Sequence, residues 1–428
     1  MNQIVNMGPR SRPALAYWIP LSLQHVFAMF GATILVPLLT GLNPATALFT
    51  AGTGTLIFIA ITGGKVPAFL GSSFAYIAAL AAISTSQGVE YAMGGAITSG
   101  LFYCIVAIII RFAGKSWLDK AMPPVVIGSV IIVIGLNLAP VAMNMSMRAG
   151  GAPDGDYSLV LLSIAAVTLL VTAITNIFFK GFICSIPILI GLAAGYIFTL
   201  VMGSFIPAYD IISFKIISDT SWFGLPGFII PKFNVVSCLT FVIVSLATIC
   251  EHLGDVLVIS RVVGRDFYKD PGLHRTLAGD GLASLWAALW GGPPNTTYGE
   301  NVGVMAITLI YSVWVIGGAA VVSVVLSCFR KFGALIQTIP TPVIGGISIL
   351  LFGVIASSGL RTLVDSGVDY KDKRNLTISS VILVIGIGGG RLAFAITKDL
   401  QFELAGIALA TAVGIILNLV FPMSKDNP

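Results

Sequence analysis

The sequence predicts an all-α polytopic membrane protein with fourteen transmembrane segments, arranged as two inverted repeats of seven spans with short extended pieces in spans 3 and 10. Three observations lead to this fold class. Hydrophobic residues make up 57% of the 428 residues and charged residues only 10%, and the mean hydropathy of +0.98 lies outside the range of soluble domains. Apolar stretches near the bilayer-spanning length of about 20 residues follow one another along the chain. Two similar segments and two broken spans recur at nearly constant separations.

Charges, prolines and glycine clusters divide the chain into the fourteen segments. They are placed at residues 17–39, 44–62, 66–84, 91–112, 122–144, 158–178, 182–203, 233–258, 273–291, 293–309, 311–329, 338–357, 376–390 and 403–421. The polar residues 1–13 lead directly into the first span without the small-residue cleavage pattern of a signal peptide, so we expect no removable signal.

Lysine and arginine predict the orientation. With the N-terminus inside and fourteen spans, 16 of the 23 basic residues fall on the inner side and 7 on the outer side. Cytoplasmic loops are enriched in these residues. We therefore expect both termini in the cytoplasm, and the net charge of +5 follows from topology without a nucleic-acid partner.

A repeat relates the two halves. Residues 124–135 and 342–353 share Pro, Val and both outer glycines at an offset of 218, and Gln24-His25 matches Glu251-His252 at an offset of 227. Chance similarity between apolar helices is the alternative for any single segment. Because seven spans per half is an odd number, the halves insert with opposite topology, as in many secondary transporters.

Two segments at the same separation look broken, residues 67–74 in span 3 and 293–300 in span 10. Each begins with Pro and small polar residues that would not sustain a helix, and then becomes apolar and helical. We expect an extended piece followed by a half-helix in each, and the extended pieces should pair or line a cavity, since lipid cannot satisfy their backbone groups. Opposite insertion would bring both half-helix N-termini, with their free N–H donors, to one point in mid-membrane.

Four of the 18 acidic residues fall inside the predicted spans: Glu251, Asp255, Asp280 and Glu300. A charge at bilayer depth is costly, which favours functional roles for Glu251 and Glu300. Together with backbone amide donors, they suit a neutral planar ligand with carbonyl oxygens and N–H groups, such as a nucleobase edge. Asp255 lies one turn from Glu251, where two negative charges repel, so one acid is expected to hold a proton for part of a transport cycle.

Other polar residues in the spans have competing interpretations. Asp280 follows basic residues near the start of a span, so a local structural pair competes with a functional role. His25 and His252 could carry protons, although a lone histidine among apolar residues is more often a helix contact. Phe74 is expected to stack on a ligand because it begins a half-helix.

Enzymatic and metal-dependent functions find no support in the sequence. The five cysteines are scattered singly without a CxxC pair. There is no HExxH motif, no nucleophile elbow and no pair of metal-binding carboxylates. We therefore expect neither a metal nor a cofactor, and no enzyme.

The segment from Glu300 to Thr308, with Asn301 and Gly303 at its second and fourth positions, resembles the signature of the nucleobase-ascorbate transporter family. Leu309 departs from the basic residue or Gly that usually follows. Residues 22–25, 71–74 and 251–255 are also similar to family elements, and the likeness runs from about residue 19 to 421. Glu before the signature Asn is typical of the bacterial members that carry uracil.

The resemblance implies proton-coupled import of uracil across the bacterial cell membrane by alternating access. It further implies a core domain of residues 1–120 and 233–335 (spans 1–4 and 8–11), a gate domain of residues 121–232 and 336–428 (spans 5–7 and 12–14), and a homodimer formed through the gate. Apart from uracil and protons, the expected partner is the surrounding lipid bilayer.

By matching position, the resemblance implies substrate contacts at Phe74, Glu251, Gly299 and Glu300, and proton coupling at Glu251 and Asp255. In this interpretation Glu300 mainly recognises the ligand and Glu251 couples ligand to proton. Two alternatives remain at this stage. The substrate could be a purine or another nucleobase, or the chain could be an anion exchanger of the related sulfate-carrier architecture, although two glutamates would repel a bound anion.

Overall fold

The computed structural model describes residues 7–209, 211–397 and 400–421, which form mainly helices and two short strand pairs. The elements of the first half are α1 (Leu15–Thr40), α2 (Pro44–Ile61), β1 (Leu70–Ser72), η1 (Phe74–Tyr76), α3 (Ile77–Ser86), α4 (Val89–Ala113), α5 (Ser116–Ala121), α6 (Pro124–Leu136), α7 (Ala139–Met147), η2 (Ala149–Gly151), α8 (Leu159–Phe178), η3 (Ile183–Ser185), α9 (Pro187–Phe205), η4 (Pro207–Tyr209) and α10 (Lys215–Asp219).

The second half begins with the longest helix of the described chain, α11 (Val235–Val263). It continues with η5 (Tyr268–Gly272), α12 (Leu273–Leu289), β2 (Asn295–Thr297), α13 (Gly299–Thr308), α14 (Val313–Ser327), α15 (Arg330–Gln337), α16 (Thr341–Asp365), α17 (Lys373–Ile387), β3 (Arg391–Thr397), β4 (Leu400–Ala405) and α18 (Gly406–Val420).

Eight helices within the described residues are long and apolar enough to cross a membrane. They are α1, α2, α4, the α6–α7 unit, α8, α9, α11 and α16. The chain is therefore a helical, multi-pass membrane protein, as the composition predicts. Each of the fourteen predicted segments overlaps at least one helix, although several of those helices are shorter than a full span.

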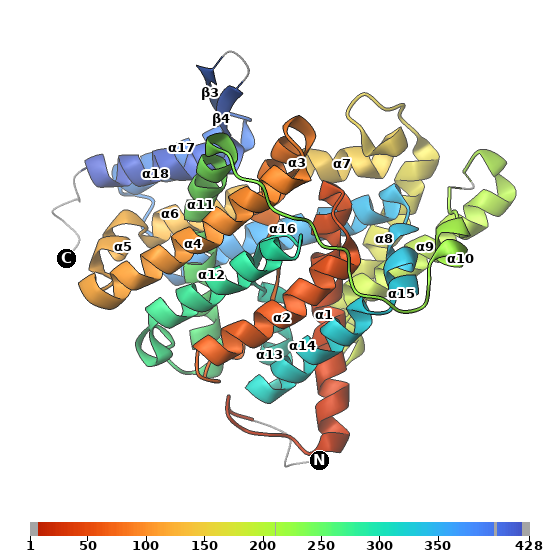
Figure 1. Cartoon of the computed structure of the whole chain (residues 1–428), viewed down its shortest axis with the longest axis horizontal. Coiled ribbons are helices and arrows are strands. Elements are labelled where there is room, and N and C mark those ends of the chain that lie inside the picture. Colours follow the sequence, from red (N-terminus) through yellow and green to blue (C-terminus); the bar gives the residue numbers. More distant parts are fainter. Residues whose placement is uncertain (1–6, 210, 398–399, 422–428) are drawn as a thin grey trace.

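Helices from the two halves of the chain intermingle. In Figure 1, α4 lies beside α12 and α2 beside α14, so orange and red segments alternate with green and cyan ones. Close approach depends on glycine: a Cβ on Gly100 of α4 would lie 2.6 Å from the carbonyl oxygen of Gly281 in α12. A Cβ on Gly128 of α6 would likewise lie 2.9 Å from the carbonyl oxygen of Gly359 in α16. Small residues at such crossings let membrane helices pack backbone to backbone.

The sequence did not predict the hairpin of β3 and β4, an exception to the all-α prediction. In the sequence, residues 400–404 alternate apolar and polar side chains, whereas residues 392–396 are all apolar. Alternation of this kind favours a strand over a helix. The last predicted span was begun at residue 403, but α18 begins at Gly406 because the residues before it belong to the hairpin.

Two further helices differ clearly from the predictions. The predicted span 122–144 is divided into α6 and α7 around Asn137 and Leu138. The span predicted to end at residue 357 continues as α16 to Asp365, whose carboxylate accepts a hydrogen bond of 3.0 Å from Arg261. Charges near its end were interpreted as the start of a loop, but the helix carries Arg361 and Asp365 beyond the predicted boundary.

Candidate functional site

The two broken spans meet in an antiparallel strand pair, β1 with β2. Two further backbone bonds extend the ladder: Ser73 N donates to Pro294 O at 2.9 Å, and Tyr298 N donates to Phe69 O at 3.0 Å. The predicted pairing of the two extended pieces is confirmed. It satisfies backbone groups that would otherwise be unpaired within the membrane.

Tyr298 packs across the strand pair onto Gly71. A Cβ at Gly71 would lie only 2.4 Å from the tyrosine ring, so no larger residue fits there without displacement. The Tyr298 hydroxyl donates to Ser72 O at 3.0 Å, from the opposite strand. The ring and its hydroxyl together fix the separation of β1 and β2.

Asn295 ties β2 to the helices around it. Its backbone N–H donates to Ser284 Oγ at 3.1 Å, and the Ser284 hydroxyl donates back to Asn295 O at 2.8 Å. Its side-chain Nδ2 donates to Thr50 O at 3.0 Å. Because Ser284 lies on α12 and Thr50 on α2, the strand is anchored to both halves of the chain.

The half-helix after β1 begins in a closed environment. Phe74 is only 3% exposed, and its ring lies edge-on to Phe352 of α16, with centroids 5.8 Å apart and an interplanar angle of 80°. The structure therefore places Phe74 between the end of strand β1 and helix α16 of the second half of the chain. Phe352 was not predicted as part of this region.

The half-helix after β2 begins in an open environment. Gly299 is exposed, and a Cβ placed on it would meet no atom within 4 Å. Glu300 follows in the first turn of α13 and is half-buried. An N-terminal turn offers unpaired amide donors, so the space beside Gly299 can receive a hydrogen-bond acceptor.

Two threonines of β2 connect the strand to the acids of α11. Thr297 Oγ1 donates to Asp255 Oδ2 at 2.7 Å, and Thr296 Oγ1 lies 3.5 Å from Glu251 Oε2. The second distance is at the limit of a hydrogen bond, so Glu251 is held less firmly than Asp255. Neither threonine was predicted as a site residue; the only local signal is an Asn-Thr-Thr run inside an apolar region.

Three of the predicted acids come together at this place. Glu251 and Asp255 lie on α11 against β2, and Glu300 lies on α13, which packs against α11. The neighbours of Glu251 and Asp255 in β2 are Thr296 and Thr297, and Glu300 lies three residues beyond Thr297 in the chain. Three buried or half-buried carboxylates on adjoining elements repel one another when all are charged, so the cluster is suited to sharing protons.

Asp280 and His252 form a buried pair of their own. His252 Nδ1 lies 3.0 Å from Asp280 Oδ2, and His252 Nε2 lies 3.1 Å from Thr276 Oγ1. Both side chains of this hydrogen-bonded pair are fully buried between α11 and α12. The predicted pair of Asp280 with residues near its own span start is wrong, because its partner is His252 on another helix. His252 makes the helix contact that was one of its two interpretations.

His25 contacts the signature asparagine. Asn301 Nδ2 lies 3.0 Å from His25 Nδ1 and donates to His25 O at 3.2 Å. His25 thus joins α1 to α13, the helix contact that was one of its two interpretations. Among the described residues, no three His, Cys, Asp or Glu side chains form a group that could hold a metal ion.

Known proteins resemble this chain over nearly its whole length. A model described as a permease family matches residues 16–393. The uracil permease of Bacillus subtilis (strain 168) is 50% identical over 430 residues, covering 99% of this chain and 97% of the relative. The uracil permease of Escherichia coli (strain K12) is 46% identical, covering 97% and 94%.

Solved structures share the fold. The transmembrane domain of the cyanobacterial bicarbonate transporter BicA superposes with a TM-score of 0.66 at 17% identity, covering 97% of this chain and 100% of that one. The structure of SLC26A9 gives a TM-score of 0.69 at 10% identity, covering 95% of this chain and 65% of that one. At these identities the likeness concerns the arrangement of helices.

Proposed function

The chain belongs to the permease family that matches it over residues 16–393, and on this premise we propose that it imports uracil together with protons by alternating access. It is a membrane transporter and not an enzyme. Relatives of nearly equal length, 46% and 50% identical, are named uracil permeases, which supports uracil as the substrate. The bacterial sources of these relatives support a bacterial cell membrane as its location.

The observation that carries the proposal is the meeting of two half-helix starts beside Glu251 and Glu300. Uracil is a neutral planar ring with two carbonyl oxygens and two N–H groups. In the proposed complex the carboxylates accept the ring N–H groups, and the backbone amides of Gly299 and Phe74 donate to the carbonyls. The uracil ring would occupy the open space beside Gly299, with the aromatic ring of Phe74 as a wall on one side.

Proton coupling is proposed for Glu251 and Asp255. Asp255 is fixed by the 2.7 Å bond from Thr297, while the contact of Glu251 with Thr296 is long. A loosely held carboxyl that meets both the ligand and a second acid can exchange its proton as the ligand arrives and leaves. Moving one charge through 100 mV supplies about 2.3 kcal/mol, enough to drive roughly fiftyfold accumulation.

The architecture proposed for this cycle has fourteen spans in two inverted repeats of seven. Residues 1–120 and 233–335 would form a core domain and residues 121–232 and 336–428 a gate domain, with both termini in the cytoplasm and a homodimer formed through the gate. Support comes from the antiparallel pairing of β1 with β2, because inverted repeats would bring equivalent segments together from opposite directions.

Uptake into proteoliposomes tests the proposal. Labelled uracil should accumulate when the bath is more acidic than the lumen, and a protonophore should abolish the accumulation. Uracil that only equilibrates, with no response to the gradient, would remove proton coupling from the proposal. Failure to carry uracil at all would overturn it.

Two alternatives are separated by competition in the same assay. A purine or another nucleobase as the true substrate would inhibit uracil uptake at lower concentrations than unlabelled uracil does. An anion exchanger would be inhibited by bicarbonate or sulfate instead, but Glu251 and Glu300 would repel an anion at this site. A thermal-shift panel of bases at several pH values would report substrate identity and proton linkage together.

A further inference from the structure

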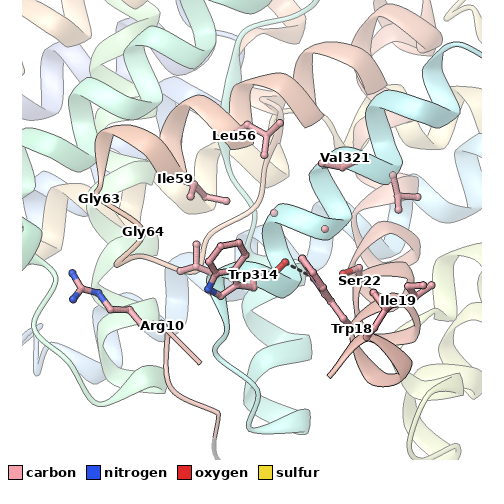
Figure 2. A pocket seen from close by; sticks show the side chains of 15 residues that line it. Arg10, Trp18, Ile19, Ser22, Leu56, Ile59, Gly63, Gly64, Trp314 and Val321 are labelled. Carbon is pink, nitrogen blue, oxygen red and sulfur yellow. Dashed lines mark hydrogen bonds between the residues drawn. The ribbon is translucent and has the colours of Figure 1, made fainter. Parts of the chain in front are cut away.

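A groove of about 870 Å³ lies between the start of α1, the end of α2 and the start of α14. Figure 2 shows Leu56 and Ile59 on one side, Ile19 and Trp18 on the other, and Trp314 between them. None of the groove's lining residues belongs to the strand pair or to the acids of the candidate site. The groove is thus a separate feature of the molecule.

The outer wall of the groove faces away from the protein. Leu15 is 67% exposed, Ile19 55% and Val321 51%. Since α1 and α2 are long and apolar enough to cross a membrane, exposed aliphatic side chains at this place would contact lipid tails. The occupant most compatible with the walls of the groove is an acyl chain.

One end of the groove carries a firmly placed N-terminal segment. Tyr311 N donates to Met7 O, and Val313 N donates to Pro9 O, each at 2.8 Å. These backbone bonds fasten residues 7–9 to the start of α14. They determine where the two arginines that follow lie.

Trp18 and Trp314 form one corner of the groove, and Arg12 lies over both rings. The guanidinium of Arg12 lies 5.2 Å from the ring centroid of Trp18 and 5.1 Å from that of Trp314, within cation–π range. Trp18 Nε1 donates to Trp314 O at 2.6 Å, a bond drawn in Figure 2. Tryptophan and arginine gather at the level of lipid headgroups, so this corner marks the membrane interface.

Arg10 lies at the mouth of the groove beside Gly63 and Gly64, as Figure 2 shows. Among the described residues it has no ion-pair partner, because the nearby Asp270 pairs with Lys65. The hydrogen bond from Lys65, and to a smaller extent the charges of Arg10 and Arg275, hold the pKa of Asp270 below its usual value. The mouth therefore carries more positive than negative charge.

We propose that this groove binds an anionic phospholipid, with one acyl chain between α1, α2 and α14 and the phosphate at Arg10. An arginine is suited to a phosphate because its planar fork donates two hydrogen bonds at once. For a lipid seated in the groove, the charge of Arg10 corresponds to roughly a fivefold preference for an anionic over a zwitterionic headgroup. A zwitterionic lipid would fill the same walls without that preference.

Two glycines of α14 define how the groove can be tested. A Cβ on Gly318 would lie 2.3 Å from Ser22 Oγ, so this position keeps α1 and α14 together and must stay unchanged. A Cβ on Gly317 would meet only Ile59 Cδ1, at 3.8 Å. Gly317→Leu should therefore place its side chain in the groove without disturbing the helix contact.

The experiment is native mass spectrometry of the purified chain with phosphatidylglycerol and phosphatidylcholine of matched acyl chains. The wild type should retain phosphatidylglycerol with about fivefold preference. Arg10→Gln should bring the two lipids to near parity, whereas Arg111→Gln, at another exposed arginine expected on the same face, should leave the preference unchanged. Gly317→Leu should reduce retention of both lipids.

Equal retention of both lipids by the wild type would overturn the proposal, as would equal effects of Arg10→Gln and Arg111→Gln. A dimer that dissociates on Gly317→Leu would assign the groove to a second copy of the chain and also overturn it. Thermal unfolding and uracil binding of each variant check folding. If Gly317→Leu does not fold, the comparison of Arg10→Gln with Arg111→Gln decides the question alone.

Discussion

The half-helices that follow β1 and β2 start from the same strand pair but present different surfaces. After β1, Phe74 is buried edge-on against Phe352, and the chain enters a 3₁₀ turn before α3 begins. After β2, Gly299 borders open space, and α13 begins at once with Glu300 in its first turn. The backbone scaffold is shared, whereas one start is closed by hydrocarbon and the other is open beside a carboxylate.

The difference between the two half-helix starts suggests that ligand recognition and conformational change depend on different sides of the strand pair. The β1 side supplies a packed wall, and its aromatic contact reaches α16, a helix of the proposed gate domain. The β2 side supplies the polar groups, including the threonines that reach the acids of α11. Recognition is therefore expected to depend mainly on the β2 side and conformational change on the β1 side.

Glu300→Gln, on the open side, is expected to have the largest effect of the variants, a loss of uracil affinity. The substitution keeps shape but replaces a charged acceptor with an amide, and a hydrogen bond to a charged group is worth about 1.5–3 kcal/mol. We expect uracil affinity to fall roughly tenfold to 150-fold, measured by isothermal titration at fixed pH. Unchanged affinity would remove Glu300 from the site. Glu90→Gln, near the start of α4, is the matched control and should bind as the wild type does.

Gly71→Ala and Gly299→Ala test the closed and open sides with the same added methyl group. At Gly71 the methyl would overlap the Tyr298 ring, and overpacking of this kind costs about 1–3 kcal/mol. We expect Gly71→Ala to lower the thermal midpoint of the apo protein. Gly299→Ala should leave that midpoint nearly unchanged while weakening uracil binding, because its methyl enters open space. Equal loss of stability in both variants would contradict the comparison.

Thr297→Val sharpens the assignment of proton coupling. It removes the hydroxyl that donates to Asp255 while keeping the side-chain volume. The charged form of Asp255 should thereby lose about 1.5 kcal/mol of stabilisation. The pH at which uptake is half-maximal should shift, whereas Thr296→Val, with the longer contact to Glu251, should shift it less. Proteoliposome uptake across a pH series measures the shift in both variants. Identical pH profiles would contradict the inference that Asp255 is bonded more firmly than Glu251.

The sequence revealed the strand pair because its signal is local. Proline and small polar residues at the start of each broken span predict extended backbone, and lipid requires such backbone to pair. The acids were found for a related reason, since Glu251, Asp255 and Glu300 stand out among apolar neighbours. Charged and helix-breaking residues in an apolar span can be recognised from the sequence alone.

The residues that were missed have no such conflict. Phe352 is an ordinary apolar residue on a helix, and only tertiary packing brings it to Phe74. Thr297 is equally inconspicuous, since a buried threonine in a membrane helix most often bonds its own backbone, as Thr172 does to Thr168 O at 2.7 Å. The hairpin of β3 and β4 was missed because residues 391–402 were interpreted as the loop between two spans, and only residues 403–405 were assigned to the span that follows.

Phe352→Leu is expected to have the smallest effect and bears on the closed side alone. An edge-to-face aromatic pair contributes about 0.5–1.5 kcal/mol beyond the burial of its area. If that contact holds one conformation, its loss should change the maximal uptake rate by roughly twofold to tenfold and leave the KM for uracil nearly constant. Phe394→Leu removes one ring of the Phe394–Phe402 pair in the hairpin, with centroids 5.1 Å apart, and should leave uptake unchanged. A change in KM without a change in rate would instead make Phe352 part of ligand recognition, because the aromatic wall would then act on the bound ring and not on the movement of the domains.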